Sequence, residues 1–218
     1  MADGPDILVY HCPPTRSVRV VFLLEELGLP YKVKRVPNPE EHRGVLRNDP
    51  EFSRINPEGR LPTIKDGDIV MEESIAIMEY LLEQYDREHK LAPPVNQRVP
   101  RADFLKWLTW SETSLSVPLG GWLRHVALLP EEERDAKAAE MYQNATIDAL
   151  RALEQGLEES PGGVVGGDFT AVDISLLFAV YILAENPRVK VLNQENYPRT
   201  YEWYQRVKER PAAKKAYD

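Results

Sequence analysis

Signals for β-strands are confined to the first third of this 218-residue chain, and the later periodic segments are all helical. The runs ILVY (7–10) and YKVKRV (31–36) are typical of strands, and the helical pattern VRVVFLLEEL between them stops at Gly28. Two strands joined through a helix are expected to run parallel in one sheet. The start of the chain is therefore predicted to be a βαβ unit.

The next segment supplies the rest of the sheet. LPTIKDGDIVM (61–71) predicts two short strands around an Asp66-Gly67 turn, the usual signal of a two-residue hairpin. A helix is expected from Glu73 to Tyr85, because its apolar residues recur on one face. The order β-α-β, loop, β-β-α indicates a small mixed sheet of four strands.

The rest of the chain is predicted to be all-helical, with helices at 102–115, 131–158, 171–185 and 197–210. Thr170 and Asp173 form a capping-box pattern before the third of these, so Asp173 is expected to be structural. The polar, proline-containing stretch 87–97 fits a linker, and a packed connection fits its composition equally well. Two domains are expected, 1–86 and 98–218.

Composition excludes several function classes. The formal net charge is −8 and the basic residues are scattered, which argues against nucleic acid or an anionic membrane as a partner. The apolar run ISLLFAVYILA (174–184) is shorter than the roughly 20 residues that span a bilayer, so it is expected to be a buried helix. A single cysteine and a start without a secretory pattern predict a reducing, cytoplasmic setting. The four histidines show no metal-binding spacing, so no metal is expected.

Several segments together resemble the cytosolic glutathione transferases over nearly the whole chain. They are the segment NPEGRLPTIKDGDIVMEESIAIMEYL (56–81) and the capping box in GDFTAVDISL (167–176). The corner TRSVR (15–19) and WLTWSETSLSVPL (107–119) further resemble the fungal and bacterial branch close to the theta class. The resemblance implies a thioredoxin-like, glutathione-binding domain at 1–86, an all-helical substrate-binding domain at 98–218, a homodimer and a role in detoxification.

The resemblance also implies a glutathione site made of His42, Arg60, Leu61, Pro62, Glu73 and Ser74. A carboxylate and a hydroxyl at a helix N-terminus suit the two charges of the γ-glutamyl group, and an extended backbone next to a cis-proline suits the cysteinyl amide. His42 and Arg60 would serve the glycyl carboxylate. The alternatives are an ordinary helix cap for Glu73-Ser74, an ordinary turn for Pro62, and solvated surface for His42 and Arg60.

Activating the glutathione thiol requires a hydrogen-bond donor, because a free thiol with a pKa near 8.5 is mostly protonated at neutral pH. By resemblance to theta-like relatives, the donor lies four residues before Arg19, which is Thr15. Ser17 is the reserve candidate, and a plain helix cap is the alternative role for Thr15. The position used by other serine classes is Pro14, which has no donor, and Cys12 precedes the position that the cysteine classes use. Tyr10 resembles a packed strand residue.

The second substrate is less defined by the sequence. The resemblance suggests that Trp110, Thr113 and Val117 face a cleft between the domains, where a mostly apolar site would take hydrophobic electrophiles or peroxides. A stripe of this kind is also typical of a helix core. Two functions remain open: a glutathione transferase with glutathione as co-substrate, and a non-catalytic relative that binds ligands or partner proteins.

Overall fold

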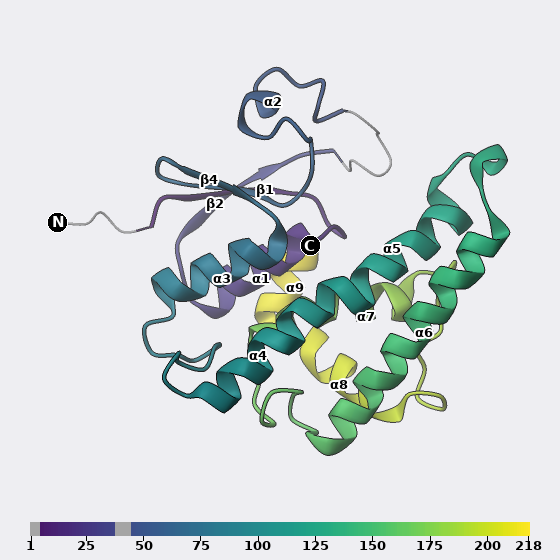
Figure 1. The fold of residues 1–218 in the computed structure, drawn as a ribbon. Coiled ribbons are helices and arrows are strands. Elements are labelled where there is room, and N and C mark those ends of the chain that lie inside the picture. Colours follow the sequence, from purple (N-terminus) through teal and green to yellow (C-terminus); the bar gives the residue numbers. More distant parts are fainter. Residues whose placement is uncertain (1–4, 38–44) are drawn as a thin grey trace. The chain divides into compact units, whose positions relative to one another are not determined.

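The computed structural model describes residues 5–37 and 45–218, which form two compact units. The first unit contains residues 1–88 together with 211–218, and the second contains residues 89–210. Each unit is described by itself. Most elements of both are labelled in Figure 1.

The first unit is built on a four-stranded mixed sheet. Its elements are β1 (Ile7–His11), α1 (Ser17–Glu26), β2 (Tyr31–Arg35), α2 (Phe52–Ile55), β3 (Thr63–Asp66), β4 (Ile69–Glu72), α3 (Ser74–Tyr85) and α9 (Pro211–Tyr217). The strand order is β2-β1-β3-β4; β1 pairs with β2 in parallel, and the other two pairs are antiparallel. The βαβ unit and the mixed sheet are thus confirmed as predicted. The hairpin turn lies one residue later than predicted, because Asp66 pairs with Ile69 and leaves Gly67 and Asp68 as the loop.

Alternation along β1 gives the sheet two different faces. Ile7, Val9 and His11 point to one side and are almost completely buried. Tyr10 points to the other, where it packs edge-on against Phe52 of α2 with ring centroids 5.0 Å apart. Figure 1 shows α1 and α3 on one side of the sheet and α2 on the other. Tyr10 is therefore a core residue, as its place in the apolar strand predicts.

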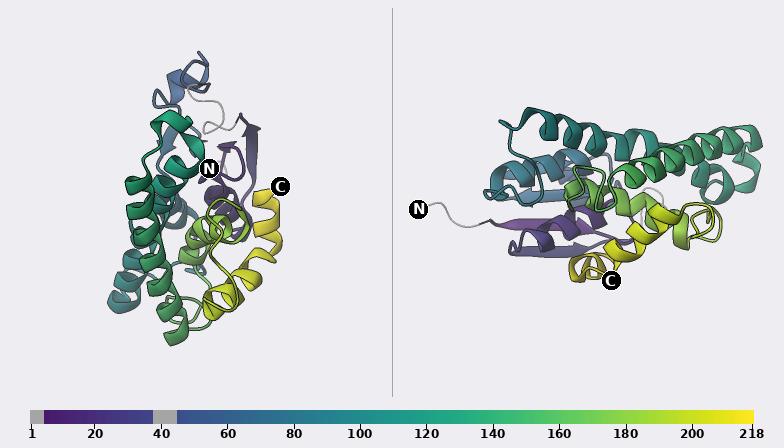
Figure 2. Two further views of the ribbon diagram at one scale, coloured as in Figure 1. Left: turned by 90° about the vertical axis from the view of Figure 1, so that its right-hand side faces the viewer. Right: turned by 90° about the horizontal axis from the view of Figure 1, so that it is seen from below.

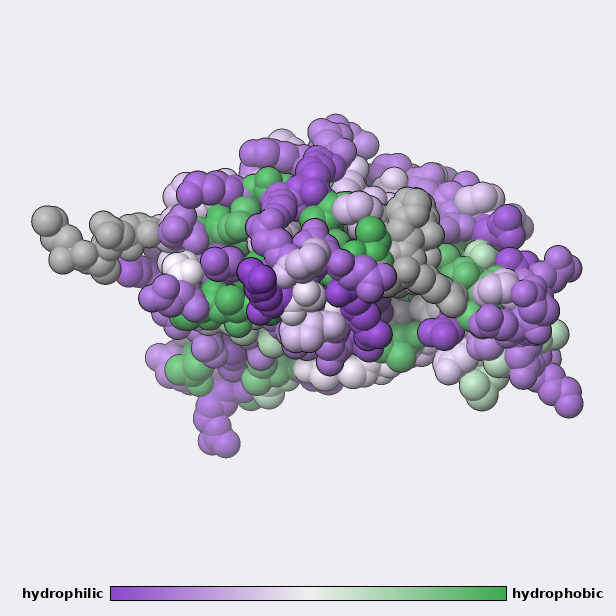
Figure 3. Space-filling model, turned by 90° about the horizontal axis from the view of Figure 1, so that it is seen from above, coloured by the Kyte–Doolittle hydropathy of each residue, from purple (hydrophilic) through white to green (hydrophobic). Residues whose placement is uncertain are grey.

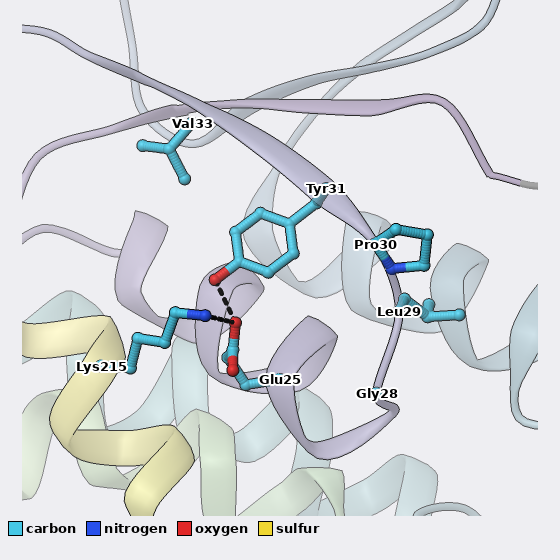
Figure 4. A pocket seen from close by; sticks show the side chains of 7 residues that line it. All are labelled: Glu25, Gly28, Leu29, Pro30, Tyr31, Val33 and Lys215. Atoms are coloured by element: carbon cyan, nitrogen blue, oxygen red, sulfur yellow. Dashed lines mark hydrogen bonds and ion pairs between the residues drawn. The ribbon is translucent and has the colours of Figure 1, made fainter.

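Helix α9 belongs to the first unit, although it follows the whole helical region in the sequence. It packs against α1, and its Ala213 and Ala216 are 1% and 0% exposed. Lys215 forms an ion pair with Glu25 of α1 at 2.6 Å, and the Tyr31 hydroxyl also donates to Glu25. Figure 4 shows both groups pointing at the Glu25 carboxylate, in an open hollow of about 490 Å³. The predicted second domain, 98–218, includes α9, whereas the structure puts α9 in the first unit. Contacts between residues far apart in sequence hold α9 there.

The second unit is helical, as predicted. Its elements are α4 (Arg98–Trp110), a π-helical segment (Ser111–Ser116), α5 (Val117–Leu123), a second π-helical segment (Arg124–Leu128), a 3-10 turn (Glu131–Glu133), α6 (Ala136–Glu159), α7 (Ala171–Glu185) and α8 (Pro198–Lys208). Figure 2 shows α6 running back beside α5, with which it packs. Helical structure thus continues from 98 to 128, well past the predicted end at 115, and Pro118 lies in this run directly after the first π-helical segment.

Helix α7 forms the centre of the second unit, and nearly all of its side chains are buried. The predicted capping box is present: the Thr170 backbone N–H donates to Asp173 Oδ2 at 2.8 Å, and the Val172 N–H donates to the Thr170 hydroxyl at 3.2 Å. Trp203 of α8 donates its indole N–H to Asp173 at 2.7 Å. The segment 89–97 is a packed connection, because Leu91 is 6% exposed and its carbonyl accepts from the Ala171 N–H.

The described surface gives no sign of a membrane span. None of the helices in residues 5–37 and 45–218 combines the length and apolar character that crossing a bilayer requires. The face drawn in Figure 3 is mostly polar, with apolar side chains in separate patches.

Candidate functional site

The sheet register brings three of the predicted segments together. Tyr10 pairs with Thr63, and Thr63 pairs with Glu72, so these residues form one row across β1, β3 and β4. Beyond this row lie the corner that follows β1, the loop that precedes β3 and the start of α3. Chain segments far apart in sequence therefore meet at one end of the sheet, which is a usual place for a binding site in such folds.

The corner after β1 is a compact turn. The Pro13–Pro14 peptide bond is cis, and the Thr15 backbone N–H donates to the Cys12 carbonyl at 2.9 Å. Helix α1 then begins at Ser17. Thr15 is 9% exposed, whereas Ser17 is 0% exposed. Of the two predicted thiol donors, only Thr15 has any surface open to a ligand.

The two hydroxyls are joined in a buried hydrogen-bond network. Thr15 Oγ1 lies 2.8 Å from Ser17 Oγ, and Ser17 Oγ lies 2.7 Å from Nδ1 of His11. The Cys12 backbone N–H donates to Ser17 Oγ at 3.1 Å. Ser17 thus stands in the middle of a series of hydrogen bonds that connects the buried imidazole of His11 to the Thr15 hydroxyl.

His11 is buried at the end of β1, with 1% of its surface exposed. Loss of solvation, which is the largest cause, and the positive charge of Arg35 together lower its pKa to about 4, although the nearby carbonyl of Ala216 opposes part of this fall. His11 is accordingly neutral at physiological pH. Its Nε2 atom has no partner in hydrogen-bond geometry among residues 5–37 and 45–218, and the Ala216 carbonyl does not reach that geometry.

The loop before β3 carries a cis bond between Leu61 and Pro62, as the sequence predicts. Asn56, which is 1% exposed, holds this loop through hydrogen bonds of its side chain. Its side-chain amide donates to the Arg60 carbonyl at 3.2 Å and to the Thr63 hydroxyl at 2.9 Å. Its side-chain oxygen accepts from the backbone N–H groups of 58 and 59 at 2.9 and 3.2 Å. The Leu61 backbone is therefore held in a fixed position.

Arg60 projects from this loop and is exposed. Its Nε lies 3.1 Å from the Glu58 carboxylate, and both side chains remain more than half exposed. An exposed pair of this kind contributes little to stability, so the guanidinium can exchange this carboxylate for another anion at small cost.

At the start of α3, Glu73 has φ 68° and ψ 104°, a left-handed conformation that is unusual for a residue with a side chain. Its exposed side chain stands at the N-terminus of the helix. Ser74 is 4% exposed, and its hydroxyl accepts from the buried guanidinium of Arg19 at 3.0 Å. Arg19 thus links α1, which follows the corner, to the start of α3.

The other predicted residues lie elsewhere. His42 lies outside the described residues. Trp110, Thr113 and Val117 are in the helical unit, where Thr113 is exposed and Val117 is 51% exposed. Trp110 is half-buried and packs edge-on against Trp107 at 5.0 Å between ring centroids. These three side chains therefore lie outside the core of their own unit.

Sequence reasoning missed two residues of this site. Asn56 lies in NPEG, which has the composition of a turn, and only the structure shows its hydrogen bonds to the neighbouring loop. His11 was considered only as a metal ligand; its signal is a titratable residue at the end of an apolar strand. No group of three or more potential metal-binding side chains occurs within the described parts of the chain.

A mixed sheet with a cis-proline loop, a hydroxyl corner and a Glu-Ser helix start, followed by a helical unit, defines the class of proteins in which a thioredoxin-like domain precedes a helical domain. Residues 8–89 match the family described as glutathione S-transferase, N-terminal domain, and residues 121–211 match glutathione S-transferase, C-terminal domain. Glutathione S-transferase GstB of Escherichia coli K12 is 30% identical over 203 residues, which is 92% of each chain. The chain belongs to the cytosolic glutathione transferase family.

Solved structures agree with this assignment. The glutathione transferase URE2P6 from Phanerochaete chrysosporium, in complex with oxidized glutathione, has a TM-score of 0.84 and 27% identity, covering 100% of this chain and 97% of its own. The theta class glutathione S-transferase from Xanthomonas axonopodis pv. citri, with glutathione bound, has a TM-score of 0.78 and 26% identity, covering 97% of each chain.

Proposed function

We propose that this chain is a cytoplasmic glutathione transferase that activates the glutathione thiol for attack on hydrophobic electrophiles or peroxides. The observation that carries the proposal is the row Tyr10–Thr63–Glu72, which brings the hydroxyl corner, the cis-proline loop and the start of α3 to one end of the sheet. Glutathione is a tripeptide with charged ends and a central thiol, so it needs groups of these three kinds close together.

Each segment suits one part of glutathione. The exposed Glu73 carboxylate would bind the γ-glutamyl ammonium, and the backbone N–H groups at the start of α3, with Ser74, suit the adjacent carboxylate. The backbone of Leu61, turned by the cis bond to Pro62, is available to pair with the cysteinyl amide as a strand would. Arg60, together with His42, would bind the glycyl carboxylate.

In the proposed reaction the Thr15 hydroxyl donates a hydrogen bond to the glutathione sulfur, keeps its own proton, and so favours the thiolate. The thiol proton leaves to solvent, and the thiolate then attacks the electrophilic centre of the second substrate. As the bond to sulfur forms, the bond to the leaving group, or the O–O bond of a peroxide, breaks, and its electron pair departs with the leaving group or the leaving oxygen. Thr15 is preferred to the reserve candidate Ser17 because Ser17 is 0% exposed and is surrounded by His11, Cys12 and Thr15. Trp110, Thr113 and Val117 of the helical unit would contact the electrophile.

Titrating the bound thiol tests this role. Thiolate absorbance in the ultraviolet, followed against pH with glutathione bound, should show the thiol pKa raised by about one unit or more in Thr15→Val, since one unit corresponds to 1.36 kcal/mol. Thr15→Ser should keep the low pKa, and calorimetric affinity for glutathione should stay within a few-fold. If Thr15→Val titrates like the parent and Ser17→Ala shifts upward, Ser17 is the donor.

A non-catalytic binding protein is the second candidate, and the 2.8 Å contact between the Thr15 and Ser17 hydroxyls favours it if the Thr15 proton points inward. Such a protein would bind glutathione without lowering the thiol pKa. Turnover of a panel of electrophiles and hydroperoxides with glutathione separates the two functions. Activity on any compound of the panel supports the transferase, and a lack of activity on every compound supports the binding protein.

We also propose a homodimer, in which the first domain of one chain pairs with the second domain of the other. A two-fold interface is the commonest way for such chains to associate. Light scattering at micromolar concentration should give about twice the chain mass of 24.9 kDa. A mass equal to that of one chain would overturn this part of the proposal.

A further inference from the structure

The hydroxyl of Thr15 can serve a bound thiolate only if its own proton points away from Ser17. Either oxygen of the 2.8 Å pair can be the donor, so the direction of that hydrogen bond is set by the rest of the network. The residue at the other end of the network is His11, whose neutral ring carries one proton on either Nδ1 or Nε2. The tautomer of His11 therefore decides what Thr15 can do.

With the proton on Nδ1, every donor in the network has an acceptor. Nδ1–H donates to Ser17 Oγ at 2.7 Å, and the Cys12 backbone N–H occupies the second acceptor position of the same oxygen at 3.1 Å. The Ser17 proton then goes to Thr15 Oγ1 at 2.8 Å, which is shorter than the 3.3 Å to the Cys12 carbonyl. Thr15 Oγ1 also accepts from the Ser17 N–H at 3.3 Å, so its own proton is left to point out of the network.

With the proton on Nε2, donor and acceptor exchange roles in both side-chain hydrogen bonds of Ser17. Nδ1 then accepts from the Ser17 hydroxyl, and the Thr15 proton points inward at Ser17. The Nε2–H would have the Ala216 carbonyl near it, but no atom of the described residues would accept it in hydrogen-bond geometry. A buried donor of this kind is costly, whereas Nδ1–H already has Ser17 as its acceptor.

We propose that His11, through Ser17, is a positioning residue that aims the Thr15 hydroxyl proton at the sulfur of glutathione. The inference rests on the proposed function of Thr15 and extends it by two buried residues behind the donor. His11 remains uncharged in this role and transfers no proton. It fixes the direction of two hydroxyl bonds, and aligned hydrogen bonds of this kind strengthen one another in a buried setting.

The tautomer can be read without glutathione. In protein with ¹⁵N-labelled histidine, long-range nitrogen–proton correlation spectra distinguish Nδ1–H from Nε2–H, and the signals of His11 are identified by their loss in His11→Asn. We expect the proton on Nδ1 at pH 7. A proton on Nε2 would overturn the proposal, whatever Thr15 does to a thiol, so this result is separate from failure of the proposed function.

Two substitutions at His11 test its effect on the sulfur. His11→Phe keeps a ring of similar size but removes the bond to Ser17, and it should raise the pKa of the bound thiol by about one unit, giving about tenfold less thiolate and turnover below that pKa. His11→Asn places an amide N–H near the position of Nδ1, and it should restore both. Binding of S-methylglutathione, which has no thiol, should change less than threefold in either variant.

The control is His89→Asn, because His89 is exposed and its φ of 54° is tolerated by asparagine. It should match the parent in thiol pKa and turnover. If Thr15→Val raises the thiol pKa but folded His11→Phe does not, Thr15 is the donor and the positioning role of His11 is refuted. If His11→Phe does not fold, the thiol pKa of His11→Asn and the tautomer of His11 in the parent test the proposal instead. A thiol pKa raised by a unit in His11→Asn would also refute it.

Discussion

Replacing Glu73 by glycine should stabilise the fold and weaken the glutathione site at the same time. Glu73 has φ 68° and ψ 104° at the N-terminus of α3, a region in which a residue with a Cβ is strained by about 1–3 kcal/mol. Glycine adopts such angles without strain but loses about 0.5–1 kcal/mol more backbone entropy on folding. The net gain should be about 1 kcal/mol relative to Glu73→Ala, which keeps the strain.

The assay compares three variants by urea unfolding and by calorimetry of glutathione binding. Glu73→Gly should unfold at a higher urea concentration than Glu73→Ala, and its Tm should be higher by about 2–4 °C for a chain of this length. Both should bind glutathione about tenfold more weakly, because each lacks the carboxylate that pairs with the ammonium. Glu73→Gln should keep the strain and lose only the charge.

A matched control is Glu72→Gly, one residue earlier in β4, where no positive φ occurs and glycine should destabilise by about 0.5–1 kcal/mol. If Glu73→Gly is no more stable than Glu73→Ala, the backbone of Glu73 is not strained and the reasoning is refuted. If Glu73→Gly binds glutathione as tightly as the parent, the carboxylate does not contact the ligand.

Three further results are expected. Asn56→Ala should cost about 1–3 kcal/mol in urea unfolding and weaken glutathione binding, because it leaves the buried loop groups without partners; unchanged binding would contradict the anchoring role. Between pH 6.5 and about 4 the unfolded chain protonates His11 and the folded chain does not, so stability should fall as pH falls through this window, by about 3 kcal/mol at most. His11→Asn should flatten that part of the profile, and an unchanged profile would assign the loss elsewhere. Deleting 211–218 should lower the Tm of the first unit by several degrees through loss of the buried face of α9 and the ion pair to Glu25; an unchanged Tm would show that α9 adds nothing.

Local patterns predicted most of the fold. The strands at 7–11 and 31–35 follow from short apolar and alternating runs, and the capping box at Thr170 and Asp173 defines the start of α7 within a few residues. Helix continuity from 98 to 128 was missed because Pro118 and the following glycines are typical of a break. The two π-helical segments depend on packing, which no local pattern encodes.

The candidate site divides in the same way. Arg60 to Pro62 and Glu73-Ser74 stand in short motifs, so the residues that would contact glutathione were visible in the sequence, as was the hydroxyl at Thr15. The residues that hold them are not local: Asn56 acts across a loop, and His11 acts through a serine six residues later. Side chains that touch a ligand leave a pattern of residue types, whereas side chains that support them are defined by tertiary contacts.

Helix α9 ties the start of the chain to residues 211–218, and this has a consequence for synthesis. A ribosome makes the sheet and α1 first, yet the apolar face of α1 that packs on Ala213 and Ala216 stays uncovered until the whole helical unit has been translated. A nascent chain released early, within the helical unit, would therefore carry an exposed apolar surface on its oldest part. Chaperones and proteases recognise surfaces of this kind. The first unit is therefore expected to be protected from degradation only after α9 has been translated and covers the apolar face of α1.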